Sequence, residues 1–197
     1  MDYRYKFYIE TKFIETSLGE IPQDWETYYL GEKAIFEVGK REKGGSLEKG
    51  DILSLGCEHI DNNGNISLKN PKYISSEFFN KMKKGKINLF DILLCKDGAK
   101  TGKVAYIKNL PIEKMAINEH LFIIRSKDDD LLNHFLFFVL FSGIGQKQIK
   151  SFYHGLIGGI NKSQIENLKI VNPPLSEQKA IAYVLSTIQE AKDRGSD

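Results

Sequence analysis

The chain has 197 residues, of which 41% are hydrophobic and 27% are charged, and its formal net charge is +2. This length and apolar content suit one or at most two soluble domains with a hydrophobic core. Because the net charge is nearly zero, any affinity for nucleic acid must come from local basic patches rather than from the field of the whole chain.

The sequence argues against membrane and secreted classes of protein. Residues 1–13 lack the apolar segment of a secretory signal. The longest apolar run, 131–141, has eleven residues, well below the ~20 that span a bilayer. Cys57 and Cys95 are far apart, which predicts buried thiols of an intracellular protein rather than a disulfide framework. We therefore expect a cytoplasmic protein with no membrane partner. The histidines and cysteines show no metal-ligand spacing, so no metal site is predicted.

The first half of the chain predicts strands mixed with short helices. Residues 3–9 alternate loosely between bulky and polar side chains, which indicates an edge strand or an arm. A short helix is predicted over 30–36 and a buried strand over 52–55. Residues 61–65 read as a turn, since Asn and Gly accept a positive φ. A helix over 75–82 is expected to be capped by one of the two serines at its start.

The second half continues this mixture. Strands over 89–95 and 104–107 enclose the loop 96–103 in a hairpin-like unit, and a further strand is expected over 120–124. An apolar helix is predicted over 131–141.

This apolar helix has predicted boundaries at both ends. The aspartates at 128–130 offer an N-terminal cap, and Gly143 and Gly145 would terminate the helix. A second, amphipathic stretch follows over 146–153.

The stretch from Gly155 onward reads as the joint between a globular domain and a helix. After a Gly-rich turn, Asn161 and Gln164 are spaced as a helix N-cap and its N3 partner. A strand over 169–171 ends at two prolines, and Ser176 is expected to cap a new helix with an acidic residue in its first turn. That helix carries the a/d spacing of a coiled-coil seam at Ile181, Val184, Ile188 and Ala191.

These residues resemble the DNA specificity subunits of type I restriction-modification systems. The resemblance rests on Ile-Asn-Lys-Ser-Gln-Ile-Glu-Asn-Leu (160–168), the following strand, Pro-Pro-Leu-Ser-Glu-Gln-Lys-Ala-Ile-Ala (173–182) and the heptad helix. At the other end, Leu-Gly-Glu-Ile-Pro-Gln-Asp-Trp (18–25) looks like the start of the family's target recognition domain. Family members usually carry two such domains and two long helices. The chain is thus expected to be a half-subunit with a single recognition domain.

The resemblance implies a mixed α/β target recognition domain over 1–174, followed by a coiled-coil-type coupling helix, shortened, over 175–197. It also implies partners: double-stranded DNA, a modification methyltransferase subunit, a restriction and translocase subunit, and a second specificity half-subunit. S-adenosylmethionine, ATP and Mg²⁺ would belong to the partner subunits. The chain itself is expected to have no cofactor and no catalytic residues, and is therefore not an enzyme.

Basic residues cluster in three places. Residues 81–103 contain seven lysines and two aspartates, and residues 146–169 contain four lysines and one glutamate. The loop at 40–43 contains two lysines and an arginine. We expect lysines to position a duplex through its phosphates, while Thr101 and the 40–43 loop read base edges. If three groups of lysines converge on one face, they form a groove for a duplex; the groups are Lys96 with Lys100 and Lys103, the lysines within 81–86, and Lys147 with Lys150 and Lys162. The candidate DNA-binding residues are Lys40, Arg41, Lys43, Lys81, Lys84, Lys96, Lys100, Thr101, Lys103, Lys147, Lys150 and Lys162.

Two other functions stay open. Residues 141–145 match the F-x-G-x-G turn of methyltransferases and 172–175 resemble their N-P-P-aromatic motif, so a small S-adenosylmethionine-dependent DNA methyltransferase fragment is one alternative. Only 52 residues follow Gly145, too few for the rest of a cofactor-binding sheet. The other alternative is an antirestriction or interaction protein that mimics a specificity subunit and does not read DNA.

The loop 98–104 looks like a phosphate-binding loop but departs from it. It has three residues between its glycines instead of four, and Val104 stands where a Mg²⁺-binding hydroxyl is needed. ATP binding is therefore not expected. Two interpretations stay open: the loop places its amides and lysines against DNA phosphates, or it is a plain hairpin turn.

Overall fold

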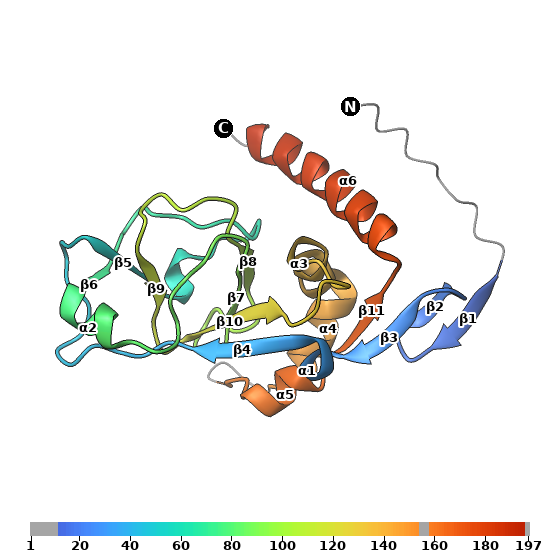
Figure 1. Cartoon of the computed structure of the whole chain (residues 1–197), viewed down its shortest axis with the longest axis horizontal. Coiled ribbons are helices and arrows are strands. Elements are labelled where there is room, and N and C mark those ends of the chain that lie inside the picture. The colour runs from blue at the N-terminus through green and yellow to red at the C-terminus, as the bar shows by residue number, and fades with distance from the viewer. Residues whose placement is uncertain (1–11, 154–157, 196–197) are drawn as a thin grey trace.

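A computed structural model describes residues 12–153 and 158–195. The strand or arm predicted over 3–9 lies outside the described residues, as does most of the Gly-rich turn. The fold is mixed α/β and ends in one long helix, as the sequence predicted (Figure 1).

The centre of the molecule is a four-stranded antiparallel sheet. In spatial order its strands are β4 (Ala34–Val38), β10 (Leu121–Ser126), β7 (Ile92–Cys95) and β8 (Val104–Tyr106). Both faces of this sheet are buried, and alternate side chains along each strand enter two different cores. On β7, for example, Ile92 and Leu94 face one core, whereas Leu93 and Cys95 face the other.

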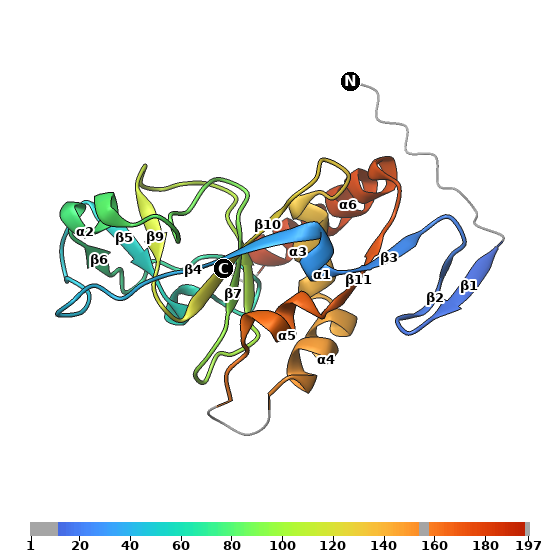
Figure 2. The same ribbon diagram turned by 60° about the horizontal axis from the view of Figure 1, so that its bottom comes forward.

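Helices cover the first face of the central sheet. They are α1 (Leu30–Lys33), α3 (Asn133–Phe141), α4 (Gly143–Ser151), α5 (Lys162–Glu166) and α6 (Leu175–Arg194). Figure 2 shows α6 lying beside α3, whose aromatic side chains fill this core. Helix α3 is apolar nearly all round, which is typical of a helix buried between a sheet and another helix.

A smaller sheet covers the second face of the central sheet. Its strands are β6 (Tyr73–Ile74), β5 (Ile52–Leu55) and β9 (Met115–Ile117), with β5 parallel to β9. The 3₁₀ turn η1 (Cys57–His59) follows β5, and α2 (Ser76–Lys81) follows β6. This sheet lies at the end of the molecule opposite the β1–β2 hairpin (Figure 1).

Two strand pairs near the chain ends complete the fold. β1 (Phe13–Thr16) and β2 (Gly19–Pro22) form a hairpin, and β3 (Glu26–Tyr29) pairs antiparallel with β11 (Lys169–Asn172). The latter pair places the chain that leads into α6 next to the chain that leads into the central sheet.

Local signals in the sequence predicted several elements correctly. The buried strand at 52–55 and the hairpin around 96–103 are present. Ser75 caps α2 by accepting a hydrogen bond from Phe78 N. The capping box of α5 is reciprocal, since Asn161 Oδ1 accepts from Gln164 N and Gln164 Oε1 accepts from Asn161 N, each at 2.9 Å.

Four predicted helix boundaries are wrong. The helix predicted over 30–36 ends at Lys33, and the residues after it form the strand β4 of the central sheet. Helix α6 is capped by Pro174 rather than Ser176, because the Pro174 carbonyl already accepts from the amide of Gln178. Helix α3 starts after Leu132 instead of at the aspartates 128–130, of which Asp128 and Asp130 pair with Lys33. The glycines at 143 and 145 do not end a helix but open α4, since the Ser142 hydroxyl accepts from the Gly145 amide and restarts the helix.

The prediction of two free thiols is also wrong. Cys57 and Cys95 form a disulfide, and their Cα atoms are 5.4 Å apart. Both residues belong to the core between the two sheets, Cys57 just after β5 and Cys95 at the end of β7. The pairing depends on how the two sheets stack, so the separation of 38 residues in sequence gave no indication of it.

Candidate nucleic-acid interface

Several predicted DNA-binding residues lie together at one end of the central sheet. Because neighbouring strands are antiparallel, the end of β4, the end of β7 and the starts of β8 and β10 share this edge. The loops that extend from it contain residues 39–43, 96–103 and 118–120. Gly39 packs so closely on the backbone of Ile117 and Asn118 that a Cβ would collide there, which holds the first and third loops together.

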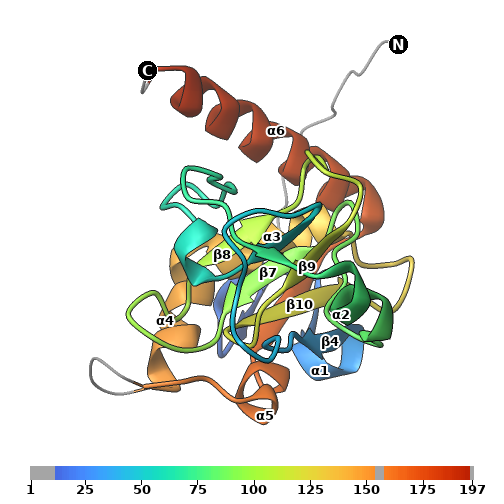
Figure 3. The ribbon, with the colours of Figure 1, turned by 90° about the vertical axis from the view of Figure 1, so that its left-hand side faces the viewer.

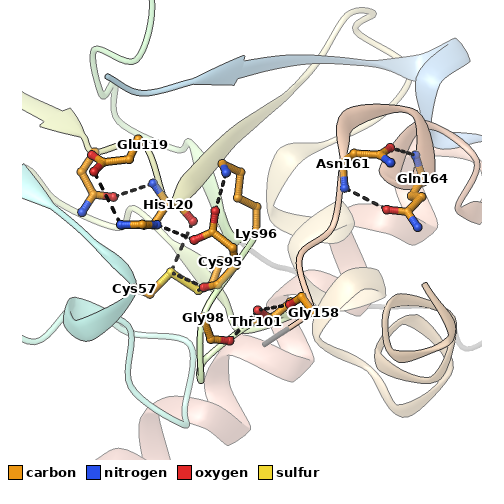
Figure 4. Close-up of polar contacts among 12 residues, drawn as sticks. Cys57, Cys95, Lys96, Gly98, Thr101, Glu119, His120, Gly158, Asn161 and Gln164 are labelled. Atoms are coloured by element: carbon orange, nitrogen blue, oxygen red, sulfur yellow. Dashed lines mark hydrogen bonds and ion pairs between the residues drawn. A yellow bond between two sulfur atoms is a disulfide. The ribbon is translucent and has the colours of Figure 1, made fainter. Parts of the chain in front are cut away.

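The β7–β8 loop has the geometry of a tight hairpin. Thr101 N donates to Gly98 O at 3.1 Å, and both Gly98 and Gly102 have a positive φ. The Thr101 hydroxyl lies within hydrogen-bond distance of the carbonyls of Gly98 and Gly158, so it serves the loop itself (Figure 4). The interpretation as a hairpin turn is thus confirmed, and Thr101 is less available to a ligand than the sequence suggested.

The lysines of this loop are tied to neighbouring turns. Lys100 Nζ donates to the carbonyl of Glu58 at 3.0 Å, and Lys103 Nζ donates to Asn62 Oδ1 at 2.6 Å. Each lysine makes one such hydrogen bond, and each acceptor oxygen is uncharged. The bonds therefore do not neutralise the two ammonium charges.

A charged cluster joins this loop to the turn before β10. Asp97 is hydrogen-bonded to both Lys96 Nζ and His120 Nδ1, as Figure 4 shows. Partial burial by itself would raise the pKa of Asp97, but the hydrogen bonds from Lys96 and His120 outweigh it and lower the pKa. The carboxylate therefore stays ionised and fixes the Lys96 ammonium and the His120 ring in place.

A hollow of about 290 Å³, here called the polar pocket, lies between these loops and β5. Acidic, basic, amide and hydroxyl side chains all reach it, which distinguishes it from an apolar ligand cavity. Lys72 spans the rim and donates to Glu58. Burial by itself would raise the pKa of Glu58, but the hydrogen bond from Lys72 outweighs it and lowers the pKa. The lining side chains are Lys40, Arg41, Glu42, Ser46, Ser54, Glu58, Lys72, Ile74, Asn118, Glu119 and His120.

The remaining predicted DNA-binding residues lie elsewhere. Lys81 pairs with Glu77 on α2, and Lys84 follows that helix. Lys147 and Lys150 are exposed on α4, which Figure 3 places on the opposite side from α2.

Lys162 pairs with Glu166 on α5, and Lys43 is exposed in the 39–43 loop. Contacts through Glu119 and His120 join the 39–43 and 96–103 groups into one surface. The 96–103 loop also contacts α4, since Gln146 Nε2 donates to Gly102 O at 3.0 Å.

Sequence reasoning missed three residues of this surface, namely Asn118, Glu119 and His120. They form the short connection between β9 and β10 and project into the polar pocket. A polar triplet between two apolar strands was the available signal.

The predicted seam of α6 is divided between the core and the surface. Ile181 packs against the helical core, whereas Val184 and Ile188 are 41% and 60% exposed and Ala191 is exposed. The buried side of α6 is instead formed by Gln178, Ala182 and Gln189.

Polar contacts hold both ends of α6 to the domain. Gln178 is fully buried, and its side chain accepts from Leu132 N and lies within 2.9 Å of the carbonyls of Asp130 and Pro173. Near the other end, Asp193 accepts hydrogen bonds from Asn63 and Asn65.

Neither methyltransferase-like motif has the required setting. The glycines at 143 and 145 lie between two helices rather than after a strand. Asn172 is buried, and its Oδ1 accepts from Gln178 Nε2 at 2.9 Å. Both motifs therefore serve the packing of the helices.

Within the described ranges, no three His, Cys, Asp or Glu side chains are placed to hold a metal ion. No helix in the same part of the chain is long and apolar enough to cross a membrane.

The chain belongs to the family of type I restriction modification DNA specificity domains, whose sequence model matches residues 22–194. It is 29% identical over 187 residues to the type I restriction enzyme MjaVIII specificity subunit of Methanocaldococcus jannaschii. The match covers 89% of this chain and 42% of that subunit. A second relative from the same organism is 28% identical over 193 residues, and the match covers 43% of that relative. The chain thus spans less than half the length of the relatives it matches.

Solved structures agree on the fold. The HsdS subunit from Thermoanaerobacter tengcongensis superposes with a TM-score of 0.66 at 18% identity, covering 91% of this chain and 40% of that one. The type I restriction-modification S subunit from M. genitalium gives 0.60 at 20% identity, with coverages of 84% and 39%. The resemblance drawn from the stretches at 18–25 and 160–182 is confirmed.

Proposed function

We propose that this chain is a non-catalytic subunit that recognises a DNA sequence and directs a modification methyltransferase and restriction complex to it. The observation that carries the proposal is the basic surface at one end of the central sheet, in a chain of the specificity family. There Lys40 and Arg41 line the polar pocket together with His120, which is hydrogen-bonded to Asp97 of the 96–103 loop. Lysines there position the duplex through its phosphates, and neighbouring polar side chains read bases.

The proposal divides the chain into two functional parts. Residues 1–174 form the target recognition domain, and 175–197 form the coupling helix. The exposed side chains Val184 and Ile188 of that helix contact the methyltransferase subunit or a second specificity half-subunit. S-adenosylmethionine, ATP and Mg²⁺ are bound by the partner subunits, and the complex works in the cytoplasm.

Duplex binding at two salt concentrations tests the proposal. Each lysine contact with a phosphate steepens the dependence of log K on log salt by about 0.9. Lys100→Ala with Lys103→Ala should therefore reduce the slope by about 1.8 and weaken all sequences alike. The matched control is Lys108→Ala with Lys114→Ala, because Lys108 also bonds an asparagine of the 61–65 turn but lies beyond the far end of β8.

The outcomes separate the candidate functions. Equal slopes for both double variants would move the DNA surface away from this loop. Absence of any salt-dependent duplex binding by the wild type would favour the mimic of a specificity subunit. Co-purification with the methyltransferase and mapping of the methylated sites would then identify the partner and the recognised sequence together.

A further inference from the structure

Two of the three carboxylates in the polar pocket are already committed. Glu42 accepts from both the amide and the hydroxyl of Ser75 and so supports the start of α2. Glu58 accepts from Lys72 Nζ at 2.5 Å across the rim of the pocket. Neither carboxylate can turn to a ligand without breaking a bond that organises the fold.

The third carboxylate, Glu119, is different. Its nearest basic nitrogens are Arg41 Nε at 3.8 Å and His120 Nε2 at 3.6 Å, both beyond hydrogen-bond distance. Within the described ranges of the chain it accepts no hydrogen bond, and its side chain is 30% exposed. Figure 4 shows it at the edge of the loop cluster, beside the His120 ring. Glu119 is therefore held near its position by charge while its acceptor sites stay open.

The neighbouring Asn118 has complementary capacity. Its Oδ1 accepts from His120 N at 2.9 Å, which fixes the amide, but its Nδ2 has no acceptor among residues 12–153 and 158–195. A Cβ on Gly56 would collide with this Nδ2, so the amide is also fixed by packing. An open donor and an open carboxylate acceptor thus stand on adjacent residues.

We propose that Glu119 reads one base pair in the major groove by accepting a hydrogen bond from an exocyclic amino group. This inference rests on the proposed DNA-recognition function. The amino group belongs to adenine N6 or cytosine N4, and only adenine adds an acceptor, N7, to which Asn118 Nδ2 would donate. A carboxylate is repelled by phosphates, so Glu119 needs cations around it to enter a groove. Arg41, whose side chain is 73% exposed, supplies that attraction at the rim.

Selection from a random duplex pool at low salt tests the inference with the full chain. Glu119→Ala should lower discrimination at one position by about tenfold or more, because it removes the acceptor for the amino group. The other positions of the selected motif should be unchanged. Glu77→Ala is the matched control, since Glu77 is also paired with a cation but lies on α2 outside the pocket.

Asn118→Asp distinguishes the two bases. It keeps the acceptor for His120 N and replaces the Nδ2 donor by a carboxylate oxygen, which cannot donate to adenine N7. It should therefore reduce discrimination at the same position if the base is adenine and leave it unchanged if the base is cytosine. Glu119→Asp serves if the alanine variant does not fold, because it keeps the charge and withdraws the acceptor by one methylene.

Two results would overturn the inference. A folded Glu119→Ala protein that selects the same motif with the same stringency removes Glu119 from base reading and leaves the proposed function intact. A wild-type chain that selects no sequence and binds no duplex defeats the proposed function itself.

Discussion

The indole Nε1 of Trp25 donates a hydrogen bond of 3.0 Å to Oε2 of Glu177, across 152 residues of sequence. The two stretches that carry the family resemblance, 18–25 and 173–182, therefore meet in space. The adjacent β3–β11 pairing, in which Glu26 lies opposite Asn172, reinforces the junction. Together they fix the direction in which α6 leaves the domain.

The first prediction concerns this junction. Trp25→Phe should lower the free energy of unfolding by about 1 kcal/mol, because it removes a partly buried hydrogen bond to a charged acceptor. Urea denaturation measures the change. In a double-mutant cycle, Glu177→Ala should add little to Trp25→Phe. As a control, the loss of stability from Glu190→Ala, farther along α6, should add to that from Trp25→Phe. If the losses from Trp25→Phe and Glu177→Ala are also additive, the hydrogen bond contributes nothing to stability.

The second prediction concerns Gln178, which is fully buried at the base of α6. Gln178→Glu keeps the shape of the side chain but leaves the carbonyls of Asp130 and Pro173 without their donor and buries a charge. We expect a loss of about 3 kcal/mol in unfolding free energy. The exposed neighbour provides the control, since Lys179→Gln should change stability by less than about 0.5 kcal/mol. A neutral Gln178→Glu variant would contradict this role.

The third prediction concerns an ion pair at the other end of the central sheet. Arg125 on β10 donates to both oxygens of Asp91 and to Glu37, while Asp91 is only 1% exposed. Burial by itself would lower the pKa of Arg125, but the hydrogen bond to Asp91 outweighs it and raises the pKa. Arg125→Met leaves a buried carboxylate without its cation, so we expect a loss of about 3–5 kcal/mol by thermal or urea unfolding.

A surface pair serves as the control for Arg125. Lys33 Nζ lies 2.7 Å from Asp130, whose side chain is 50% exposed. Lys33→Met should cost no more than about 1 kcal/mol. Similar losses for both variants would mean that burial of Asp91 does not matter.

The sequence predicted what local patterns determine. A short apolar run located β5, and glycines with polar neighbours located the β7–β8 hairpin. The spacing of Asn161 and Gln164 located the start of α5. Each of these signals acts within a few residues, so no knowledge of the tertiary fold was needed.

The sequence did not predict the contacts that depend on how the sheets stack. No feature of the sequence near Arg125 or Asp91 indicates that these two residues pair. The stacking of two sheets also brings Cys57 to Cys95, and the short β9–β10 connection brings Glu119 into the polar pocket. The buried side of α6 was misjudged for the same reason, because a heptad pattern does not say which face meets the domain.

The fourth prediction concerns the disulfide. It closes a loop of 38 residues and links η1 to the end of β7. By loop-closure entropy, reduction should lower the free energy of unfolding by up to about 4 kcal/mol. Urea denaturation with and without a thiol reductant measures this, and Cys57→Ser with Cys95→Ser should match the reduced protein. If the double variant is as stable in oxidising buffer as the wild type, the linkage does not stabilise the fold.

The fifth prediction concerns the acid side of the stability profile. The pKa of Asp97 is lower in the folded protein than its ordinary value, because the hydrogen bonds from Lys96 and His120 outweigh its burial. A lowered pKa means that the unfolded chain binds the proton more tightly. The stabilisation is therefore fully present above the ordinary carboxyl pKa of about 4 and is lost as the pH falls through the folded value.

Asp97→Asn should be less stable than the wild type at pH 7 and should lose less stability between about pH 5 and pH 3. Asp51→Asn, at an exposed aspartate just before β5, should follow the wild-type profile. Profiles of Asp97→Asn and wild type that run parallel over the whole range would show that the cluster around Asp97 does not contribute to folding.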